Sequence, residues 1–440
     1  MENYTERNVH WKDSIIPFAL VLGFLILTVI VPVMRTSNGQ PTYAGDVSYD
    51  TLLFQTGNMS FPASVYSLYA RIPENIQLGL NALLVAFSML IFVVFLKQYR
   101  PARHVRWFIL ALLGLSPVML SSGSQLSPAA LLLFLSVLTL FVGERKPALL
   151  FIPSLLLLFT SPISWMFVTG IQSVLGVRTR VWKISTIAGL LLLVFMRITG
   201  LAIGIPRLIP LGFVADLGHA TGQSIFLLIL SILGIFIAWQ SLPRRIQLAF
   251  VVFIVAIFFS SEVLLLSTFV TATLGGLGLN ILLRRRWGFV ILRDASILLV
   301  ACGLLFSCLA YVSEGSKGLP SQHMAGALST VKAFPAGVII TPFEFSSFSS
   351  YESGKSDFFY ASGGSETSKS AIYSALLNST KYNEAAETLA KTGAKYNYIV
   401  LTSEDLAKER SGLAFLVENS ERFISVARYS DVEVWLHIRP

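Results

Sequence analysis

The pattern of hydrophobic and polar positions divides the chain into two parts. From residue 13 to residue 312, long apolar runs alternate with short polar or basic clusters, whereas residues 313–440 mix apolar and polar positions as a water-soluble domain does. A run of about 18–22 apolar residues is the length that crosses about 30 Å of hydrocarbon as a helix. We therefore expect a polytopic α-helical membrane domain over residues 1–312 and a soluble domain over residues 313–440.

The apolar runs predict about eleven transmembrane helices. Residues 147–177 form an apolar hairpin broken at Ser161-Pro162, and the two short arms of this hairpin leave the count open there. Inside a later run, Gly275-Gly-Leu-Gly278 predicts close helix packing rather than a nucleotide-binding loop. The other runs expected to span are Ile15–Met34, Gln77–Phe95, Trp107–Leu120, Leu126–Val142, Ile184–Ile203, Ser224–Trp239, Ile246–Leu266, Ser267–Leu283 and Val290–Val312.

Basic residues between the runs orient the predicted helices. With the N-terminus in the cytoplasm, nearly all Lys and Arg of the connecting segments lie inside, and the outer segments carry only Arg35, Arg71 and Arg207. Under the positive-inside rule, this asymmetry fixes the orientation. An odd number of spans then predicts a multi-pass protein of the cell membrane with an extracytoplasmic C-terminal domain.

Composition agrees with a membrane protein. Hydrophobic residues make up 54% of the chain and charged residues 13%, about half the charged share of a soluble domain. The net charge of +9 arises from the basic clusters beside apolar runs, which are topology signals. We therefore expect the lipid bilayer as a partner of this protein, and we do not expect it to bind nucleic acid.

The tail reads as an α/β domain. Short β-branched and aromatic runs predict strands, and apolar positions at helical spacing predict helices. The Ser-, Gly- and Tyr-rich segment Ser346–Ser368 predicts an extended loop. The expected strands are Gly337–Thr341, Tyr396–Leu401, Phe423–Tyr429 and Val432–Ile438, and the expected helices are Thr380–Thr392 and Ser403–Asn419.

The first outer loop carries the strongest candidate chemistry. Asp46 and Asp50 are four residues apart, so a helical turn would put both carboxylates on one face. A positioned carboxylate can act as a general base, or it can bind a divalent metal such as Mg or Mn that screens a phosphate leaving group. The alternative is a polar loop without function, as is common at membrane surfaces.

Ionisable residues beside the apolar runs are the second group of candidates. Glu262, at the outer end of a run, binds substrate or metal in the same outer cavity as Asp46, or else it reaches interfacial water. Arg197 near the outer leaflet suits a lipid phosphate, whereas Arg207 either does the same or snorkels to the headgroups. Asp216 and His219 share a metal or a proton, or belong to a plain polar loop.

The first-loop run Gly45-Asp46-Val-Ser-Tyr49 resembles that of the GT-C superfamily of membrane glycosyltransferases. Ser-Pro motifs in the middle runs agree with this plan (Ser116-Pro117, Ser127-Pro128 and Ser161-Pro162), as do the tail runs Gly337-Val-Ile-Ile-Thr-Pro342 and Tyr396-Asn-Tyr-Ile-Val400. The family includes oligosaccharyltransferases and protein O-mannosyltransferases.

The resemblance implies transfer of a sugar from a polyprenyl- or dolichyl-phosphate-linked donor to a protein or glycan acceptor on the extracytoplasmic side. It also implies that Asp46 is the catalytic base or a metal ligand, with Tyr49 and Asp50 beside the substrate. The predicted metal ligands are Asp46, Glu262, Asp216 and His219, and the predicted substrate-binding residues are Tyr49, Asp50, Arg197, Arg207 and Glu262.

The sequence also departs from the oligosaccharyltransferases. It lacks their Trp-Trp-Asp-Tyr-Gly signature, and it has Ser121-Ser-Gly-Ser-Gln125 where they carry a second acidic motif. Ser260-Ser261-Glu262 is similar to their Ser-Val-Ser-Glu motif. Two alternatives therefore stay open: a catalytically inactive homologue that serves as an assembly or binding subunit, and a lipid or solute transporter.

Overall fold

The structure is a computed structural model, and it describes residues 2–43, 46–57, 64–99, 101–177, 179–199, 208, 212–214, 222–241, 243–258, 260–285, 288–317, 320–342, 345–358, 366–406 and 412–439. The chain divides into two compact units. The helical unit comprises Met1–Val31 and Ser60–Ser316, and the C-terminal unit comprises Pro32–Met59 and Lys317–Pro440. The first outer loop is therefore part of the C-terminal unit.

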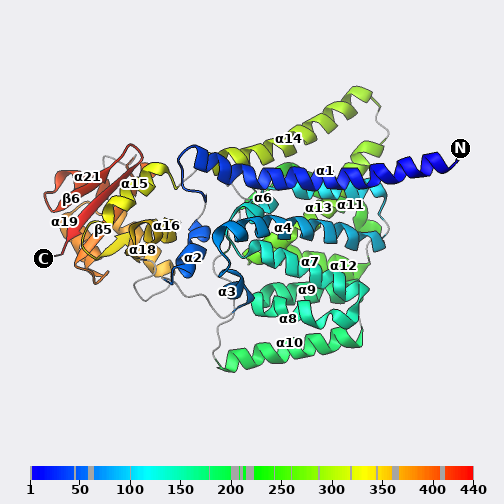
Figure 1. The fold of residues 1–440 in the computed structure, drawn as a ribbon, viewed down its shortest axis with the longest axis horizontal. Coiled ribbons are helices and arrows are strands. Elements are labelled where there is room, and N and C mark those ends of the chain that lie inside the picture. Colours follow the sequence, from blue (N-terminus) through cyan, green and yellow to red (C-terminus); the bar gives the residue numbers. More distant parts are fainter. Residues whose placement is uncertain are drawn as a thin grey trace. The chain divides into compact units, whose positions relative to one another are not determined.

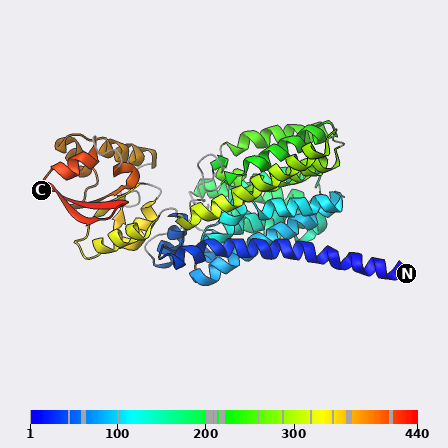
Figure 2. The same cartoon turned by 90° about the horizontal axis from the view of Figure 1, so that it is seen from above.

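Long helices lie side by side in the helical unit (Figure 1 and Figure 2). Two short strands, β1 (Gly212–Val214) and β2 (Gly222–Gln223), pair in parallel beside them. The helices are α1 (Glu2–Ser37), α3 (Val65–Tyr69), α4 (Glu74–Leu96), η1 (Lys97–Tyr99), α5 (Arg103–Gly114), α6 (Pro117–Ser124), α7 (Ala129–Arg145), η2 (Pro147–Leu149), α8 (Phe151–Thr160), α9 (Pro162–Leu175), α10 (Arg180–Thr199), α11 (Ile225–Ala238), η4 (Trp239–Ser241), α12 (Arg244–Ile257), α13 (Ser261–Arg284) and α14 (Val290–Lys317).

Five helices among the described residues are long and apolar enough to cross a membrane: Ile15–Ser37, Glu74–Tyr99, Arg180–Thr199, Ser261–Arg284 and Val290–Ser316. A sixth arises if α5 and α6, which meet at 56°, form one broken span. The other predicted spans are shorter apolar helices, and large side chains such as Phe236 and Ile291 are 72% and 80% exposed. Such exposed apolar surface suits a bilayer. The count of about eleven spans and their orientation stay predictions.

Serine residues set two of the helix boundaries. Ser161 caps α9, because its side chain accepts a hydrogen bond from Ser164 N, and Pro162 is the first helical residue. Serine is favoured at the N-cap position of a helix, and proline is favoured at the first helical position. The predicted break at Ser161-Pro162 is therefore confirmed. The boundary predicted between Leu266 and Ser267 is wrong, because Ser260 caps α13 by accepting from Val263 N and the helix starts at Ser261.

Glycines bring α13 close to its neighbours. A Cβ atom at Gly278 would lie 2.0 Å from the carbonyl oxygen of Leu230 in α11, and one at Gly276 would lie 2.6 Å from a side-chain carbon of Ile109 in α5. Only a residue without a side chain permits these approaches. The prediction that Gly275-Gly-Leu-Gly278 packs helices is confirmed.

A five-stranded sheet, in the order β4-β3-β5-β7-β6, forms the centre of the C-terminal unit. Strands β3 (Val338–Ile340), β4 (Ser356–Asp357) and β5 (Tyr396–Thr402) run parallel. Strand β7 (Val432–Ile438) pairs antiparallel with β5, and β6 (Phe423–Arg428) pairs antiparallel with β7 at the edge of the sheet. The four strands expected from the sequence are confirmed, because each is a short apolar run bounded by turn residues. On one face of the sheet, residues such as Ile340, Ile399, Leu401 and Trp435 share a buried core with helical leucines.

Helices surround this sheet, and they correct two expectations. The serine-rich segment predicted as an extended loop contains a helix over Ser346–Ser353, and the single helix predicted over Ser403–Asn419 is two shorter helices among the described residues. The helices of this unit are α2 (Asp46–Gln55), α15 (Gln322–Val331), α16 (Ser346–Ser353), α18 (Glu366–Leu377), α19 (Tyr382–Ala390), α20 (Ser403–Leu406) and α21 (Leu413–Asn419).

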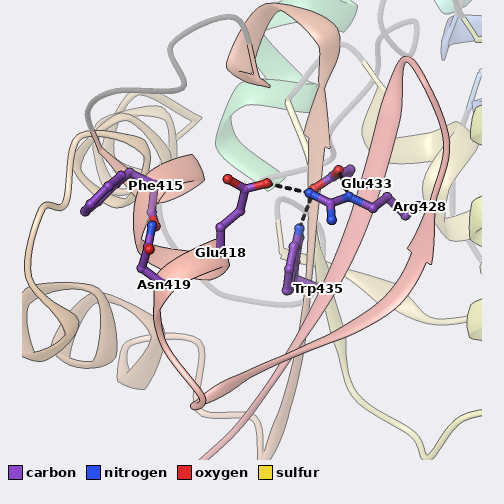
Figure 3. A network of polar contacts seen from close by, with 6 residues as sticks. All are labelled: Phe415, Glu418, Asn419, Arg428, Glu433 and Trp435. Atoms are coloured by element: carbon purple, nitrogen blue, oxygen red, sulfur yellow. Dashed lines mark hydrogen bonds and ion pairs between the residues drawn. The ribbon is translucent and has the colours of Figure 1, made fainter.

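A charged network joins α21 to the β6–β7 hairpin (Figure 3). The guanidinium of Arg428 donates to Glu418 of α21 and to Glu433 of β7. Glu433 also accepts from Trp435 Nε1 at 3.0 Å, and its side chain is only 7% exposed, whereas that of Glu418 is 48% exposed. A buried carboxylate without hydrogen-bond partners destabilises the folded state. We therefore expect the bonds to Glu433 to stabilise the C-terminal unit.

Replacing Arg428 by Met should destabilise the C-terminal unit by about 1–2 kcal/mol, since Glu433 stays buried with only the indole N–H as a partner. Thermal unfolding of the full chain measures this change. The matched control is Glu418→Gln, which removes only the exposed arm and should cost less than about 0.5 kcal/mol. Equal effects of the two variants would contradict the account.

A buried histidine lies on the same hairpin. His437 of β7 contacts Phe423 and Tyr382, and its Nε2 lies 3.1 Å from the Tyr382 hydroxyl. Burial lowers the pKa of His437, and the positive charge of Arg422 lowers it further. Both effects favour the neutral imidazole in the folded unit.

Because the pKa of His437 is lower in the folded state, its full contribution to stability is present above the pKa of a histidine in the unfolded chain, about 6.5. Stability should then fall by up to about 1.4 kcal/mol per pH unit as the pH drops from there through the folded-state pKa. Calorimetric unfolding between pH 7.5 and pH 5 measures this slope. His437→Gln, which cannot titrate, should flatten it, and an unchanged slope in that variant would refute the assignment.

Candidate functional site

The first outer loop folds into a buried helix. Residues 46–53 of α2 are all buried, and Asp46 and Asp50 are only 8% and 0% exposed. Both aspartates reach the same neighbouring helix, α16, as their spacing of four predicts for a helical turn. The loop is therefore not a solvated connection but part of the core of the C-terminal unit.

The carboxylate of Asp46 caps helix α16. The N-cap residue of that helix, Phe345, makes no side-chain capping bond. Instead, Phe348 N donates to Asp46 Oδ1 at 2.7 Å, and the Ser346 hydroxyl lies 3.4 Å from Asp46 Oδ2. A negative charge at a helix N-terminus satisfies unpaired N–H groups and the helix dipole. Asp46 is thus held in a fixed orientation.

Asp50 extends the same contact by one helical turn. Its Oδ1 accepts a hydrogen bond from the Ser347 hydroxyl. Between the two aspartates, Tyr49 is 3% exposed and packs edge-on against Phe348, with ring centroids 4.8 Å apart. Burial raises the pKa of Tyr49 well above its ordinary value, which the positive charge of Arg35 opposes. Tyr49 is therefore a neutral packing residue on the helix that carries Asp46.

Arg35 holds the start of this loop in place by hydrogen bonds. It is fully buried, its Nε donates to Pro41 O at 2.6 Å, and an Nη atom donates to Pro320 O at 2.7 Å. The sequence identified Arg35 only as one of the few outer charges, and it missed Ser346 and Ser347 altogether. Their partners are some 300 residues away along the chain, so no local pattern could have paired them.

Glu262 occupies a second polar site, inside the helical unit. It lies in the first turn of α13, and one oxygen, Oε2, accepts from the Ser161 hydroxyl, from the Ser164 hydroxyl at 2.7 Å and from Ser164 N at 3.2 Å. The Ser161-Pro162 motif and the Ser260-Ser261-Glu262 motif therefore meet. Among the described residues, Glu262 Oε1 has no hydrogen-bond partner, so it can accept one from a ligand.

Of the four remaining predicted site residues, the structure describes Arg197. Arg197 is exposed in the last turn of α10. Arg207, Asp216 and His219 lie outside the described residues. Over the part of the chain that the structure describes, no three side chains of His, Cys, Asp or Glu are grouped as metal ligands. The proposed four-residue metal site stays a prediction.

Comparison with known proteins identifies the fold. No protein-family model matches the sequence, and no curated protein matches it. Solved structures do match: the Archaeoglobus fulgidus oligosaccharyltransferase AglB in complex with an inhibitory peptide and a dolichol-phosphate aligns at 10% identity over 93% of this chain and 72% of its own, with a TM-score of 0.51. The chain has the fold of an archaeal oligosaccharyltransferase.

Further structures from the same organism agree. The oligosaccharyltransferase complex with Zn and sulfate aligns at 11% identity over 94% of this chain and 72% of its own, with a TM-score of 0.52. The form tethered to an acceptor peptide containing the NVT sequon aligns at 10% identity over 94% and 74%, also with a TM-score of 0.52. The predicted resemblance is therefore confirmed at the level of the fold, which is what a likeness at this identity establishes.

Asp46→Ala should release the N-terminus of α16, because it leaves a buried N–H without an acceptor, at a cost of about 1–3 kcal/mol. Asp46→Asn should keep the contact, since its amide oxygen still accepts from Phe348 N. Hydrogen exchange of the full chain reports this difference as faster exchange in α2 and α16 for the alanine variant only. Equal protection in both variants would show that Asp46 does not hold α16.

Proposed function

We propose that this protein is a membrane glycosyltransferase that transfers a sugar from a polyprenyl- or dolichyl-phosphate-linked donor to a protein or glycan acceptor on the extracytoplasmic side. The observation that carries this proposal is the fold match over 93–94% of the chain, which spans the helices and the α/β domain alike. The matched enzyme is known in complex with a dolichol-phosphate and tethered to an acceptor peptide.

Asp46 is the proposed reacting group. A carboxylate whose rotamer is fixed by a helix N-terminus is preorganised, as catalytic groups need to be. In the transfer, the acceptor O–H or N–H attacks the anomeric carbon, its proton passes to Asp46, and the bond from that carbon to the phosphate oxygen breaks. The lipid phosphate leaves with the electron pair of that bond. Tyr49 and Asp50 support the acceptor side.

The helical unit supplies the proposed donor contacts. Glu262 Oε1 can accept a hydrogen bond from a sugar hydroxyl, because the three bonds to Oε2 hold the carboxylate in place. Arg197 and Arg207 are proposed to bind the lipid phosphate, for which a guanidinium supplies paired donors.

A divalent metal is part of the same proposal, since one matched structure contains Zn. The described donors fit it poorly: both Asp46 oxygens face donors of α16, and no three described ligand-type side chains are grouped. When bound, a divalent metal would screen the phosphate charge.

The capping of α16 by Asp46 favours a second candidate. A carboxylate whose two oxygens both face protein donors serves as a structural clasp, and the Trp-Trp-Asp-Tyr-Gly signature is absent from the sequence. A non-catalytic subunit that binds the lipid-linked sugar without transferring it would keep both features.

Transfer by the purified protein in lipid nanodiscs separates the two candidates. With a labelled dolichyl-phosphate sugar and peptide or glycan acceptors, Asp46→Asn should lower the rate by about 10²–10⁴-fold, the usual contribution of a general base. Asp294→Asn, at an exposed ion pair on α14, is the matched control and should leave the rate unchanged.

Full activity in Asp46→Asn would reject Asp46 as the base. Binding of the labelled donor without any transfer by the wild type would select the non-catalytic subunit, and the absence of both binding and transfer would reject both candidates.

A further inference from the structure

A basic cluster lies at one end of the helical unit, where α13 ends and α5 begins. His104 in the first turn of α5 places Nε2 2.7 Å from Asn280 Oδ1 and 3.1 Å from an Nη atom of Arg284. Asn280 and Arg284 are one turn apart on α13, so they share a face. The three side chains form what we call the α5–α13 basic seam.

The seam is placed by rigid packing. One turn before Asn280, Gly276 lets α13 approach α5 so closely that an added Cβ would lie 2.6 Å from Ile109 and 3.4 Å from the carbonyl oxygen of Val105. Two helices in such contact cannot slide or rotate freely. The close packing of α5 against α13 therefore keeps His104 and Arg284 next to each other.

Among the described residues, neither His104 nor Arg284 makes an ion pair with an acidic side chain. Helix α5 has no acidic residue, and the only one in α13, Glu262, lies in its first turn, at the far end of a 24-residue helix. At a rise of 1.5 Å per residue, the far end is about 33 Å away.

Two features of this end match a lipid headgroup rather than a free anion. The candidate membrane spans Glu74–Tyr99 and Ser261–Arg284 both end in this region, and the end of a helix that crosses the hydrocarbon core lies next to the headgroups. Tyr99 and Leu283 are 46% and 37% exposed, and an exposed tyrosine at a span end is typical of a membrane interface. Apolar surface thus adjoins the basic groups, as an acyl chain next to a phosphate requires.

We propose that the α5–α13 basic seam binds the phosphate of an anionic phospholipid headgroup. Arg284 donates to the phosphate oxygens, a ring N–H of His104 adds a second donor, and Asn280 orients the imidazole. Basic pockets between transmembrane helices are known to recognise anionic headgroups. The proposal is independent of the proposed glycosyltransferase activity, since none of its residues belongs to the Asp46 or Glu262 site.

The test uses the full-length protein, delipidated in detergent and titrated with phosphatidylglycerol or with phosphatidylcholine, with bound lipid counted by native mass spectrometry. The wild type should retain phosphatidylglycerol in preference to phosphatidylcholine. Arg284→Gln and His104→Gln should each weaken phosphatidylglycerol binding by about fivefold, the effect of about 1 kcal/mol per basic residue near a membrane surface.

Arg293→Gln is the matched control, because Arg293 is exposed on α14 and already paired with Asp294 at 2.8 Å. It should leave phosphatidylglycerol binding unchanged, and the melting temperatures of all variants verify folding. Equal retention of the two lipids, or wild-type binding in both seam variants, would overturn the proposal. Complete displacement by excess inorganic phosphate would overturn the lipid assignment in favour of a free anion site.

Discussion

A hydrogen bond from Phe348 N to the Asp46 carboxylate joins the two segments of the C-terminal unit, which are 302 residues apart in sequence. The bond supplies helix α16 with the cap that its own residues lack, and it buries the first outer loop against the α/β domain. This loop directly follows α1, which is long and apolar enough to cross a membrane. The buried Arg35 strengthens the same junction by donating to two carbonyl oxygens.

The helical unit uses the same device. Glu262 accepts from the N-terminus of α9 through Ser164 N, and from two serine hydroxyls of the same turn. In both units, then, a buried carboxylate satisfies the start of a helix from another segment. Burying a charge without partners costs free energy. Asp46 and Glu262 therefore each favour the one backbone arrangement in which their hydrogen-bond donors are in place. Glu262 differs from Asp46 in keeping one oxygen available to a ligand.

The strands of the C-terminal unit could be predicted from the sequence, because β5 and β7 are rich in β-branched and aromatic residues, a local pattern that needs no distant partner. The break at Ser161-Pro162 was equally local, since serine and proline favour a helix start by themselves. Helix α16 could not be predicted: its Ser-rich sequence carries weak helical preference, and its cap comes from Asp46. The meeting of Ser161 with Glu262, 101 residues apart, likewise left no local signal.

The central claim is that Asp46, held by α16, faces a lipid-linked sugar. A cryo-electron microscopy structure of the protein with a non-hydrolysable dolichyl-phosphate sugar analogue tests this most directly. The account predicts the anomeric carbon near the Asp46 carboxylate, with the bond from Phe348 N intact. Density for the analogue elsewhere, with Asp46 enclosed by α16 and remote from the sugar, would contradict it.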